Sequence, residues 1–176
     1  NSNISGKSVV YIMSRDQRVR DNHAILEAQA CAIEQNVPLY VLFVLKKIYT
    51  RSQEHFKFML DGLREVSESL YSRGVPFVLR VGDPYEVVTG FANEVNASAL
   101  FFDFSPFKGA RSIIREIARN FDASVTVVDT HNIIPLWVAS DKKEFAAHTM
   151  RRKVHNHLDE LLTVPPLLKE QTRVTQ

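Results

Sequence analysis

Short apolar runs alternate along the chain with stretches in which apolar residues recur every three or four positions. Five runs are rich in branched and aromatic side chains, at residues 9–13, 38–45, 76–81, 99–102 and 124–128. They are almost continuously apolar instead of alternating, which is typical of a parallel strand covered on both faces. The pattern therefore predicts five buried parallel strands.

Helical spacing fills the gaps between these runs. Apolar residues recur at steps of three and four over residues 24–32, 56–70 and 110–121. Such stripes predict helices with one buried face. The gap before residue 99 opens with Asp83 and Pro84, which suit the cap and the first position of another helix.

The end of the chain predicts one more helix and then a linker. We expect the helix over residues 142–162, with Asp141 as its cap and Glu144 completing a capping box. Residues 163–176 contain two adjacent prolines and no sustained period. This composition predicts the start of an interdomain linker.

Strands that alternate with helices indicate an α/β domain, expected over residues 1–162. Crossovers between parallel strands are right-handed, which favours a Rossmann-like, doubly wound sheet with helices on both faces. The strand order that we expect is 3-2-1-4-5, with the C-terminal helix added outside the sheet.

Composition narrows the class of protein without deciding its function. The 176 residues suffice for one domain, and the net charge of +2 gives no general argument for nucleic-acid or membrane binding. No apolar run approaches the roughly 20 residues that cross a bilayer, and no signal peptide is visible. The single cysteine, Cys31, is interpreted as a small core residue. An intracellular, cytoplasmic setting is therefore expected.

Candidate chemistry gathers in two loops. In an open α/β sheet, ligands bind beyond the carboxyl ends of the strands, near the point where the strand order reverses. The loops there hold the candidate residues Ser14, Arg15, Asp16 and Asn22 in the first, and Asp103, Ser105 and Lys108 in the second. Each residue has a structural alternative, as a helix cap, a turn residue or part of a solvated face. Together they favour a small-molecule site about as strongly as a structural role.

The familiar reaction and nucleotide motifs are missing from the sequence. No G-x-G-x-x-G follows the first strand, and the phosphate-loop ending "SGKS" at residues 5–8 lacks the required glycine upstream. The six histidines are scattered, and no spacing supports a metal site or a catalytic triad. The basic stretch "RRKVHNH" at residues 151–157 is interpreted as a solvated or interdomain helix face in preference to a nucleic-acid contact. The chain therefore resembles a binding domain without a reaction of its own.

Several long stretches resemble class II cyclobutane pyrimidine dimer photolyases. They are "MSRDQRVRDNHAILEAQ", "FMLDGLREVSESL", "FFDFSPFKGAR" and "VDTHNIIPLWVASDKKEFAAHTMRRKVHNHL", in the order of the family and within residues 8–170. The sequence departs at His23, where the family more usually has tryptophan, and at Thr130, where alanine is usual.

The resemblance implies a fold and a function for the parent protein. Photolyases of this type have an N-terminal α/β domain and a C-terminal helical domain, which holds flavin adenine dinucleotide (FAD) and UV-damaged DNA. Excited reduced flavin donates an electron to the dimer, which splits. The α/β domain can hold an antenna chromophore, a deazaflavin or a folate. This chain then represents the antenna domain, inactive in repair alone, with its own helical domain as partner.

The same resemblance suggests how the candidate residues divide between roles. An antenna ring would lie between the two loops, with Asp103 accepting from its N–H groups and Phe104 offering an apolar face. Further along, His131, Asn132 and Trp137 are expected to fix the crossing towards the other domain. The Trp137 indole N–H is expected to bond to backbone.

Two other functions remain open on the sequence. One is a free-standing nucleotide-binding protein of the universal-stress type, although "DFSPFKGAR" has a single glycine where that family has a glycine-rich phosphate loop. The other is a purely structural domain with a vestigial crevice. Adenine-nucleotide titration would test the first of these.

Overall fold

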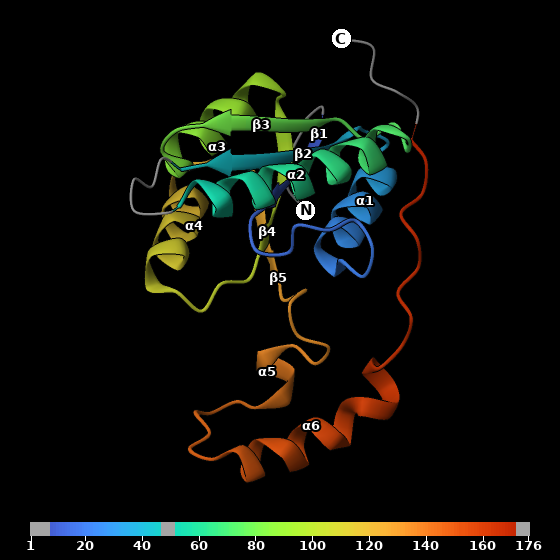
Figure 1. Ribbon diagram of the computed structural model, residues 1–176, viewed down its shortest axis with the longest axis vertical. Coiled ribbons are helices and arrows are strands. Elements are labelled where there is room, and N and C mark those ends of the chain that lie inside the picture. Colours follow the sequence, from blue (N-terminus) through green and yellow to red (C-terminus); the bar gives the residue numbers. More distant parts are fainter. Residues whose placement is uncertain (1–7, 47–51, 172–176) are drawn as a thin grey trace.

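The five strands form one parallel sheet in the computed structural model, which describes residues 8–46 and 52–171 (Figure 1). The strands are β1 (Ser8–Met13), β2 (Leu39–Leu45), β3 (Phe77–Val81), β4 (Ala97–Asp103) and β5 (Ser124–Val128). Their order is β3-β2-β1-β4-β5, which confirms the predicted α/β class and the predicted order 3-2-1-4-5. The "SGKS" stretch, apart from Ser8, lies outside the described residues.

Helices cover both faces of the sheet. They are α1 (His23–Gln35), α2 (Gln53–Tyr71), α3 (Pro84–Glu94) and α4 (Lys108–Asn120). One buried cluster joins the sheet to α1 and α2, and a second joins the opposite face to α3 and α4. Strands β1 and β4 are buried at every position because they lie in the middle of this sandwich. Among the described helices, none is long and apolar enough to cross a membrane.

Side-chain caps define where three of these helices begin, and the caps of α1 and α3 bear on the predictions. The Asp83 carboxylate accepts from the backbone N–H of Tyr85 at 2.9 Å and caps α3, as predicted, with Pro84 in the first turn. Asn22, and not the neighbouring Asp21, caps α1 by accepting from the N–H of Ile25. Asp21 instead adopts a left-handed backbone conformation, with φ of 50°, in the turn before the cap.

The predicted last helix is wrong in its first turns. A short helix α5 (Leu136–Ala139) precedes a loop, and α6 (Ala147–Leu161) begins five residues later than the expected start at residue 142. Asp141 lies in the loop, and Ala146 occupies the cap position of α6 without a side-chain hydrogen bond. The capping box proposed for Asp141 and Glu144 is therefore not formed.

A network around Lys153 explains this difference. The Lys153 ammonium lies 2.7 Å from the Glu144 carboxylate and donates to the Ser140 hydroxyl at 2.8 Å. Ser140 in turn donates to Glu144 at 2.8 Å. Glu144 is thereby held against the side of α6, so the loop folds back on the helix and does not extend it. Bonds from Lys153 and Ser140 lower the pKa of Glu144 to about 2.

Residues 163–171, which we call the strap, return from α6 to the amino end of the sheet (Figure 1). No helix or strand forms among residues 163–171, yet several contacts attach the strap to the domain. That it begins an interdomain linker stays a prediction. Leu168 is buried in the α1–α2 core, and Gln29 exchanges two 2.8 Å hydrogen bonds with the backbone of Lys169. The Gln171 side chain bonds to both backbone groups of Leu39 and to the Gly74 carbonyl.

Candidate functional site

The two loops predicted to carry the site meet at the carboxyl ends of β1 and β4. These strands are neighbours in the centre of the sheet, and the chain leaves them towards opposite sides. The loop after β1 and the loop after β4 therefore face each other across the switch point, where ligands of open α/β sheets bind. Asp103, the last residue of β4, joins them.

Asp103 is buried and organises the whole β1–α1 loop. Its Oδ2 accepts from the backbone N–H groups of Ser14 and Arg15 at 2.8 Å and of Asp16 at 3.2 Å. Its Oδ1 accepts from the Tyr11 hydroxyl at 2.6 Å. Three backbone donors on one carboxylate oxygen fix the path of the loop, because charge-assisted hydrogen bonds are stronger than neutral ones.

Tyr11 and Asn22 extend this network below the loop. The Tyr11 hydroxyl accepts from the Asn22 amide at 3.0 Å while donating to Asp103. Burial raises the pKa of the Tyr11 hydroxyl well above its usual value of 10.0, and the Asp103 carboxylate adds to the rise. Asn22 also donates to the carbonyls of Asp16 and Arg18, so its side chain ties the helix start to the loop.

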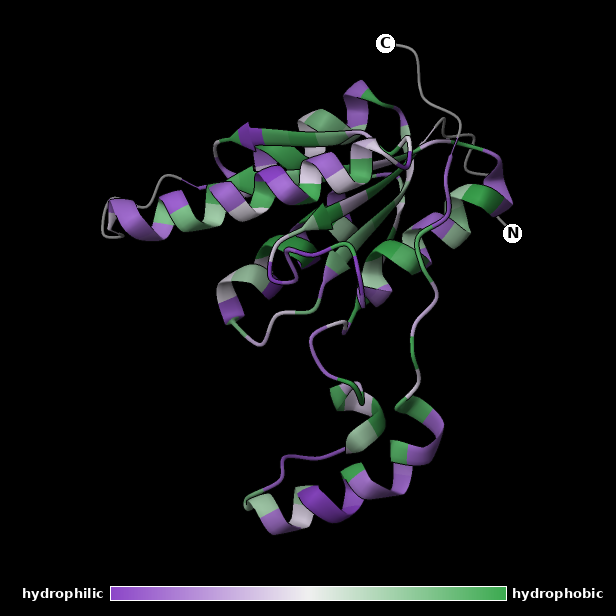
Figure 2. Ribbon diagram, turned by 45° about the vertical axis from the view of Figure 1, so that its right-hand side comes forward, coloured by the Kyte–Doolittle hydropathy of each residue, from purple (hydrophilic) through white to green (hydrophobic). Residues whose placement is uncertain are grey.

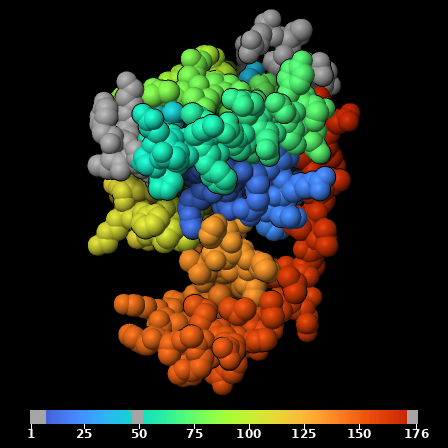
Figure 3. Space-filling view, viewed as in Figure 1, coloured from blue at the N-terminus to red at the C-terminus, as the bar shows by residue number. Residues whose placement is uncertain are grey.

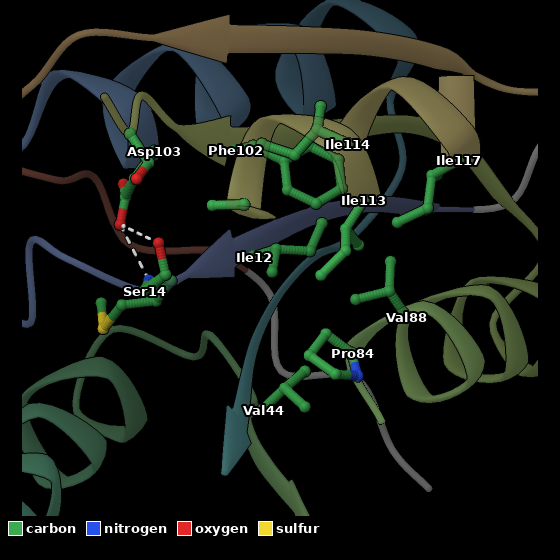
Figure 4. A pocket seen from close by; sticks show the side chains of 13 residues that line it. Ile12, Ser14, Val44, Pro84, Val88, Phe102, Asp103, Ile113, Ile114 and Ile117 are labelled. Carbon is green, nitrogen blue, oxygen red and sulfur yellow. Dashed lines mark hydrogen bonds between the residues drawn. The ribbon is translucent and has the colours of Figure 1, made fainter. Parts of the chain in front are cut away.

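Beside Asp103 lies an apolar cavity of about 180 Å³, which we call the α3–α4 slot (Figure 4). It opens between the sheet and the two helices that cover this face. Its lining residues are Ile12, Met13, Ser14, Val44, Pro84, Val88, Phe102, Asp103, Ser105, Ala110, Ile113, Ile114 and Ile117. Figure 4 shows Ser14 hydrogen-bonded to Asp103 at one end of the slot, with branched and aromatic side chains along the rest.

The structure brings some of the predicted site residues to the slot and not others. Ser14, Asp103 and Ser105 line it. Lys108 begins α4 and is exposed, and Asn22 is buried as the cap of α1. Contact of these residues with a chromophore stays a prediction, to which the structure adds that both Asp103 oxygens already accept from protein donors.

Arg15, Phe104 and Asp16 lie around the slot without lining it. The Arg15 guanidinium donates to the Phe104 carbonyl at 3.3 Å, which ties the two loops together. Phe104 makes an edge-to-face contact with Trp137, with ring centroids 5.6 Å apart. The carboxylate of Asp16 is buried and pairs with Arg18 and with Nδ1 of His131. In the part of the chain that the structure describes, its Oδ2 has no hydrogen-bond partner.

The segment after β5 is fixed by Asp129 as well as by His131. Asp129 is buried, and its carboxylate accepts from the Asn132 side chain at 2.9 Å and from the Leu136 N–H at 3.1 Å. Trp137 is 53% exposed, and its indole N–H donates no hydrogen bond within the described residues, so the expected backbone bond is wrong. The roles of His131 and Asn132 inside this domain are to position the loop.

Sequence reasoning missed the apolar part of the slot. Ile113, Ile114 and Ile117 belong to the apolar stripe of α4, which predicts a helix face packed on the sheet and says nothing of a gap beneath it. Val44 and Pro84 reach the slot from the β2 end and the α3 start. The sequence did indicate that three strand ends meet on one side of the sheet. It could not indicate how much space is left between them and the helices.

The arrangement is suited to binding. Its polar groups hold the loops, and its body is apolar, as is common in pockets that bind small molecules. Among the described residues no cluster of histidine, cysteine and carboxylate side chains is placed to hold a metal ion. The slot therefore offers an apolar surface with a polar mouth.

Comparison with known proteins identifies the family of this chain. The sequence matches the family described as DNA photolyase over residues 9–171. The chain belongs to the DNA photolyase family. It is 40% identical over 166 residues to the deoxyribodipyrimidine photo-lyase of Potorous tridactylus and 37% identical over 164 residues to that of Arabidopsis thaliana. These photolyases are of the class II type, which confirms the resemblance of the sequence motifs.

Solved structures of photolyase relatives share the fold at low sequence identity. A bacterial class III photolyase from Agrobacterium tumefaciens superposes with a TM-score of 0.71 at 17% identity, covering 98% of this chain and 37% of that one. A cryptochrome from Synechocystis gives a TM-score of 0.66 at 12% identity, covering 96% of this chain and 38% of that one. At these identities the likeness supports the fold alone.

The chain spans about a third of the length of the curated photolyases that it matches. Both alignments cover 92% of this chain, but only 31% of the Potorous protein and 33% of the Arabidopsis protein. The matched part is the N-terminal photolyase domain. The match alone therefore does not assign the activity, substrates or partners of the longer proteins to this chain.

Proposed function

We propose that this chain is the light-harvesting domain of a deoxyribodipyrimidine photolyase, and that the α3–α4 slot receives the ring of its antenna chromophore. The observation that carries the proposal is the family match over residues 9–171, combined with a slot at the switch point of the sheet. In the complete enzyme, a helical domain would hold FAD and the damaged DNA. That domain would use light to split cyclobutane pyrimidine dimers.

The lining of the slot fits the ring of a deazaflavin or a folate. Ile12, Val88 and Ile114 offer apolar surface to a flat ring, and Ser14 and Ser105 stand at the polar mouth. Pockets that bury a whole drug-sized ligand have about 300–1,000 Å³. The slot of about 180 Å³ is smaller than that, so our proposal is that it receives only the ring and that the polar tail stays at the mouth.

The protein's task at this site is to bind and orient. A bound antenna absorbs light and passes excitation energy on, which requires a fixed position and no acid, base or nucleophile. Asp103 serves this by holding the backbone of Ser14, Arg15 and Asp16 in place. The rigid loop and the packed helices keep the mouth of the slot in one shape.

Filling the slot tests the antenna site. We would titrate a deazaflavin and a reduced folate into the 176-residue chain and follow absorbance and fluorescence. Ala110→Phe places a ring in the slot, whereas Ala118→Phe places one on the exposed side of the same helix. The first variant should lose about tenfold or more in affinity and the second should change little. Equal affinities for all three proteins, or no binding by a folded wild type, would overturn the antenna site.

A second experiment addresses the parent activity. The complete reading frame that contains this chain should restore light-dependent survival to a photolyase-deficient bacterium after ultraviolet exposure. The 176-residue chain alone should not. Repair that does not depend on light would contradict the photolyase assignment, whatever the titration shows.

A further inference from the structure

A cavity of about 460 Å³ lies between the carboxyl edge of the sheet and the end of α6. Polar residues of the loops after β1 and β5 form one wall, among them Asp21, His131 and Asn132. The end of α6 and the start of the strap form the other wall, which includes Leu162 and Val164. We call this cavity the α6-end pocket. It shares no lining residue with the α3–α4 slot.

The pocket lies where the end of the chain turns back towards the sheet. Figures 2 and 3 show α6 below the body of the sheet domain, with the strap rising from its C-terminal end. Apolar side chains line the pocket at this turn, and Ile133, Leu162 and Val164 are between 58% and 93% exposed. Cavities that hold a whole small molecule have about 300–1,000 Å³. The pocket is therefore large enough for a small ligand with an apolar body.

His131 presents a hydrogen-bond acceptor to the pocket. Its Nδ1 lies 3.2 Å from a carboxylate oxygen of Asp16, which is buried and paired with Arg18. A carboxylate in such a pair can only accept, so Nδ1 carries the hydrogen. Nε2 of the neutral ring is then left as an acceptor. The side chain is 49% exposed and lines the pocket, so a ligand can reach this atom.

Asn132 is fixed in the same way by a different carboxylate. Its side-chain nitrogen donates to both oxygens of the buried Asp129, at 3.0 and 2.9 Å. The amide oxygen is thereby turned away from Asp129, and it accepts no hydrogen bond within residues 8–46 and 52–171. Two buried carboxylates thus occupy the donors of His131 and Asn132 and leave their acceptor atoms for a ligand.

The charge around the pocket favours a cation. Asp21 lines it with an exposed carboxylate, which forms no ion pair in the part of the chain that the structure describes. Helix α6 ends at the pocket, and the C-terminus of a helix carries partial negative charge. The last turn of α6 adds the exposed Asp159 and Glu160 and holds no basic side chain.

Arg18 and His23 also line the pocket and are the groups that would oppose a cation. The Arg18 guanidinium is paired with the buried Asp16 carboxylate. It also donates to the backbone carbonyls of Asp21 and Thr130. The charge of this arginine is therefore balanced inside the loop, while the Asp21 carboxylate and the α6 terminus remain available to a ligand.

We propose that the α6-end pocket binds a small organic cation, a protonated amine or guanidine with an apolar body. Its N–H groups donate to Nε2 of His131 and to Oδ1 of Asn132, and its charge lies towards Asp21. Its body packs against Leu162 and Val164. A metal cation is a poor occupant, because no cluster of three histidine, cysteine or carboxylate groups among the described residues could hold one. This inference goes beyond the antenna function and does not depend on it.

Matched ligands separate the charge from the apolar body. Phenethylamine, phenethyl alcohol and hydrocinnamate share a ring and a short chain, and they end in an ammonium, a hydroxyl and a carboxylate group. We would titrate each into the isotope-labelled 176-residue chain and follow the backbone amides by NMR. The amine should saturate with a dissociation constant on the order of 1 mM or below. The alcohol should bind about tenfold more weakly, and the carboxylate more weakly still.

A matched pair of variants tests the location of the site. Leu162→Lys adds a cation to the wall of the pocket, whereas Leu167→Lys makes the same change on the strap outside it. The two leucines are 61% and 65% exposed, so both variants should fold. Leu162→Lys should weaken binding of the amine about tenfold or more, because like charges repel. Leu167→Lys should stay within about twofold of the wild type.

Asp21→Asn removes the charge of the pocket with little disturbance of the backbone. Asp21 has φ of 50°, a left-handed conformation that asparagine also adopts readily. The variant should bind the amine about threefold more weakly and the alcohol as the wild type does. Asp122→Asn removes an exposed carboxylate outside the pocket and should leave both affinities unchanged.

The same chemistry occurs in a free amine and in a lysine or arginine side chain of another protein. A blocked phenylalanyl-arginine amide presents the side chain without free peptide ends. Tighter binding of this peptide than of phenethylamine would assign the pocket to a protein side chain, and the opposite order would assign it to a free amine. Either order supports a site for organic cations.

Three outcomes would overturn the proposal. The first is no saturable binding of any cation by the folded wild type up to about 20 mM. The second is an affinity for the alcohol or the carboxylate that equals or exceeds that for the amine. The third is equal binding of the amine by the Leu162 and Leu167 variants. Chromophore titration reports on the slot, so failure here leaves the antenna proposal unchanged.

Discussion

Replacing Asp103 by alanine should destabilise the domain strongly, because one carboxylate satisfies several buried donors. The change leaves the hydroxyl of Tyr11 and the N–H of Asp16 without an acceptor, and both groups are buried. Each unsatisfied group costs about 1–3 kcal/mol, while water can replace the bonds to the partly exposed Ser14 and Arg15. We expect a loss of about 3–5 kcal/mol in the free energy of unfolding.

Urea denaturation followed by circular dichroism and by the fluorescence of Trp137 measures this loss. A domain of this size shifts by about 2–4 °C per kcal/mol, so the melting temperature should fall by about 6–20 °C. Asp103→Asn retains one acceptor oxygen and should cost less. Asp122→Ala removes an exposed aspartate and should stay within about 0.5 kcal/mol of the wild type. A loss under about 1 kcal/mol for Asp103→Ala would refute the organising role of this carboxylate.

Four further predictions follow from caps, titration and composition. Asp83→Ala removes the cap of α3 and should cost about 1 kcal/mol, whereas Asp141→Ala removes no cap and should cost less than half of that in the same melts. Because the pKa of the Tyr11 hydroxyl is raised, its contribution to stability is present below pH 10.0 and is lost as pH rises further. Alkaline unfolding of the wild type should show this loss, and Tyr11→Phe should not. The lowered pKa of Glu144 means that its contribution to stability is present above pH 4.5 and is lost as pH falls towards 2. The hydrogen-exchange protection factors of amides in the first turns of α6, corrected for the intrinsic pH dependence of exchange, should therefore fall over that range, and Glu144→Gln should remove this fall. The isolated chain should retain no FAD through gel filtration, because the helical domain expected to hold it is not in this sequence.

Each of these predictions has a result that would contradict it. Equal melting shifts for the Asp83 and Asp141 variants would remove the distinction between a capping and a non-capping aspartate. Identical alkaline unfolding profiles of the wild type and Tyr11→Phe would show that the Tyr11 hydroxyl does not cause the loss of stability at high pH. Protection factors in α6 that do not change with pH in the wild type would show that the Glu144–Lys153 contact does not hold the helix start. Stoichiometric yellow flavin on the purified chain would contradict the last prediction.

The sheet was predictable because its determinants are local. The runs at residues 9–13 and 99–102 are continuously apolar, which only a strand covered on both faces tolerates in this setting. Alternation with helices and right-handed crossovers then leave few topologies, and strand order 3-2-1-4-5 is among them. The cap at Asp83 was visible for the same reason, since cap and helix are adjacent in the sequence.

The features that sequence reasoning missed depend on distant partners. The start of α6 is set by Lys153, which draws Glu144 away from the capping role that its position suggested. The carboxylate of Asp103 meets the backbone of Ser14 across 89 positions of the chain. Its residue type and place at a strand end indicated importance, but the number of donors that it satisfies appears only when the two loops are placed together.

The strap also determines how tension along the chain would be distributed. The Gln171 side chain is hydrogen-bonded to the backbone of Leu39 and Gly74, at the amino end of the sheet. Helix α6 lies beyond the opposite, carboxyl end (Figure 1). A pull applied after residue 171 would load these bonds and the Leu168 contact before any force reached α6. The load would then enter the sheet at the amino end of β2, the strand whose carboxyl end carries Val44 into the lining of the slot.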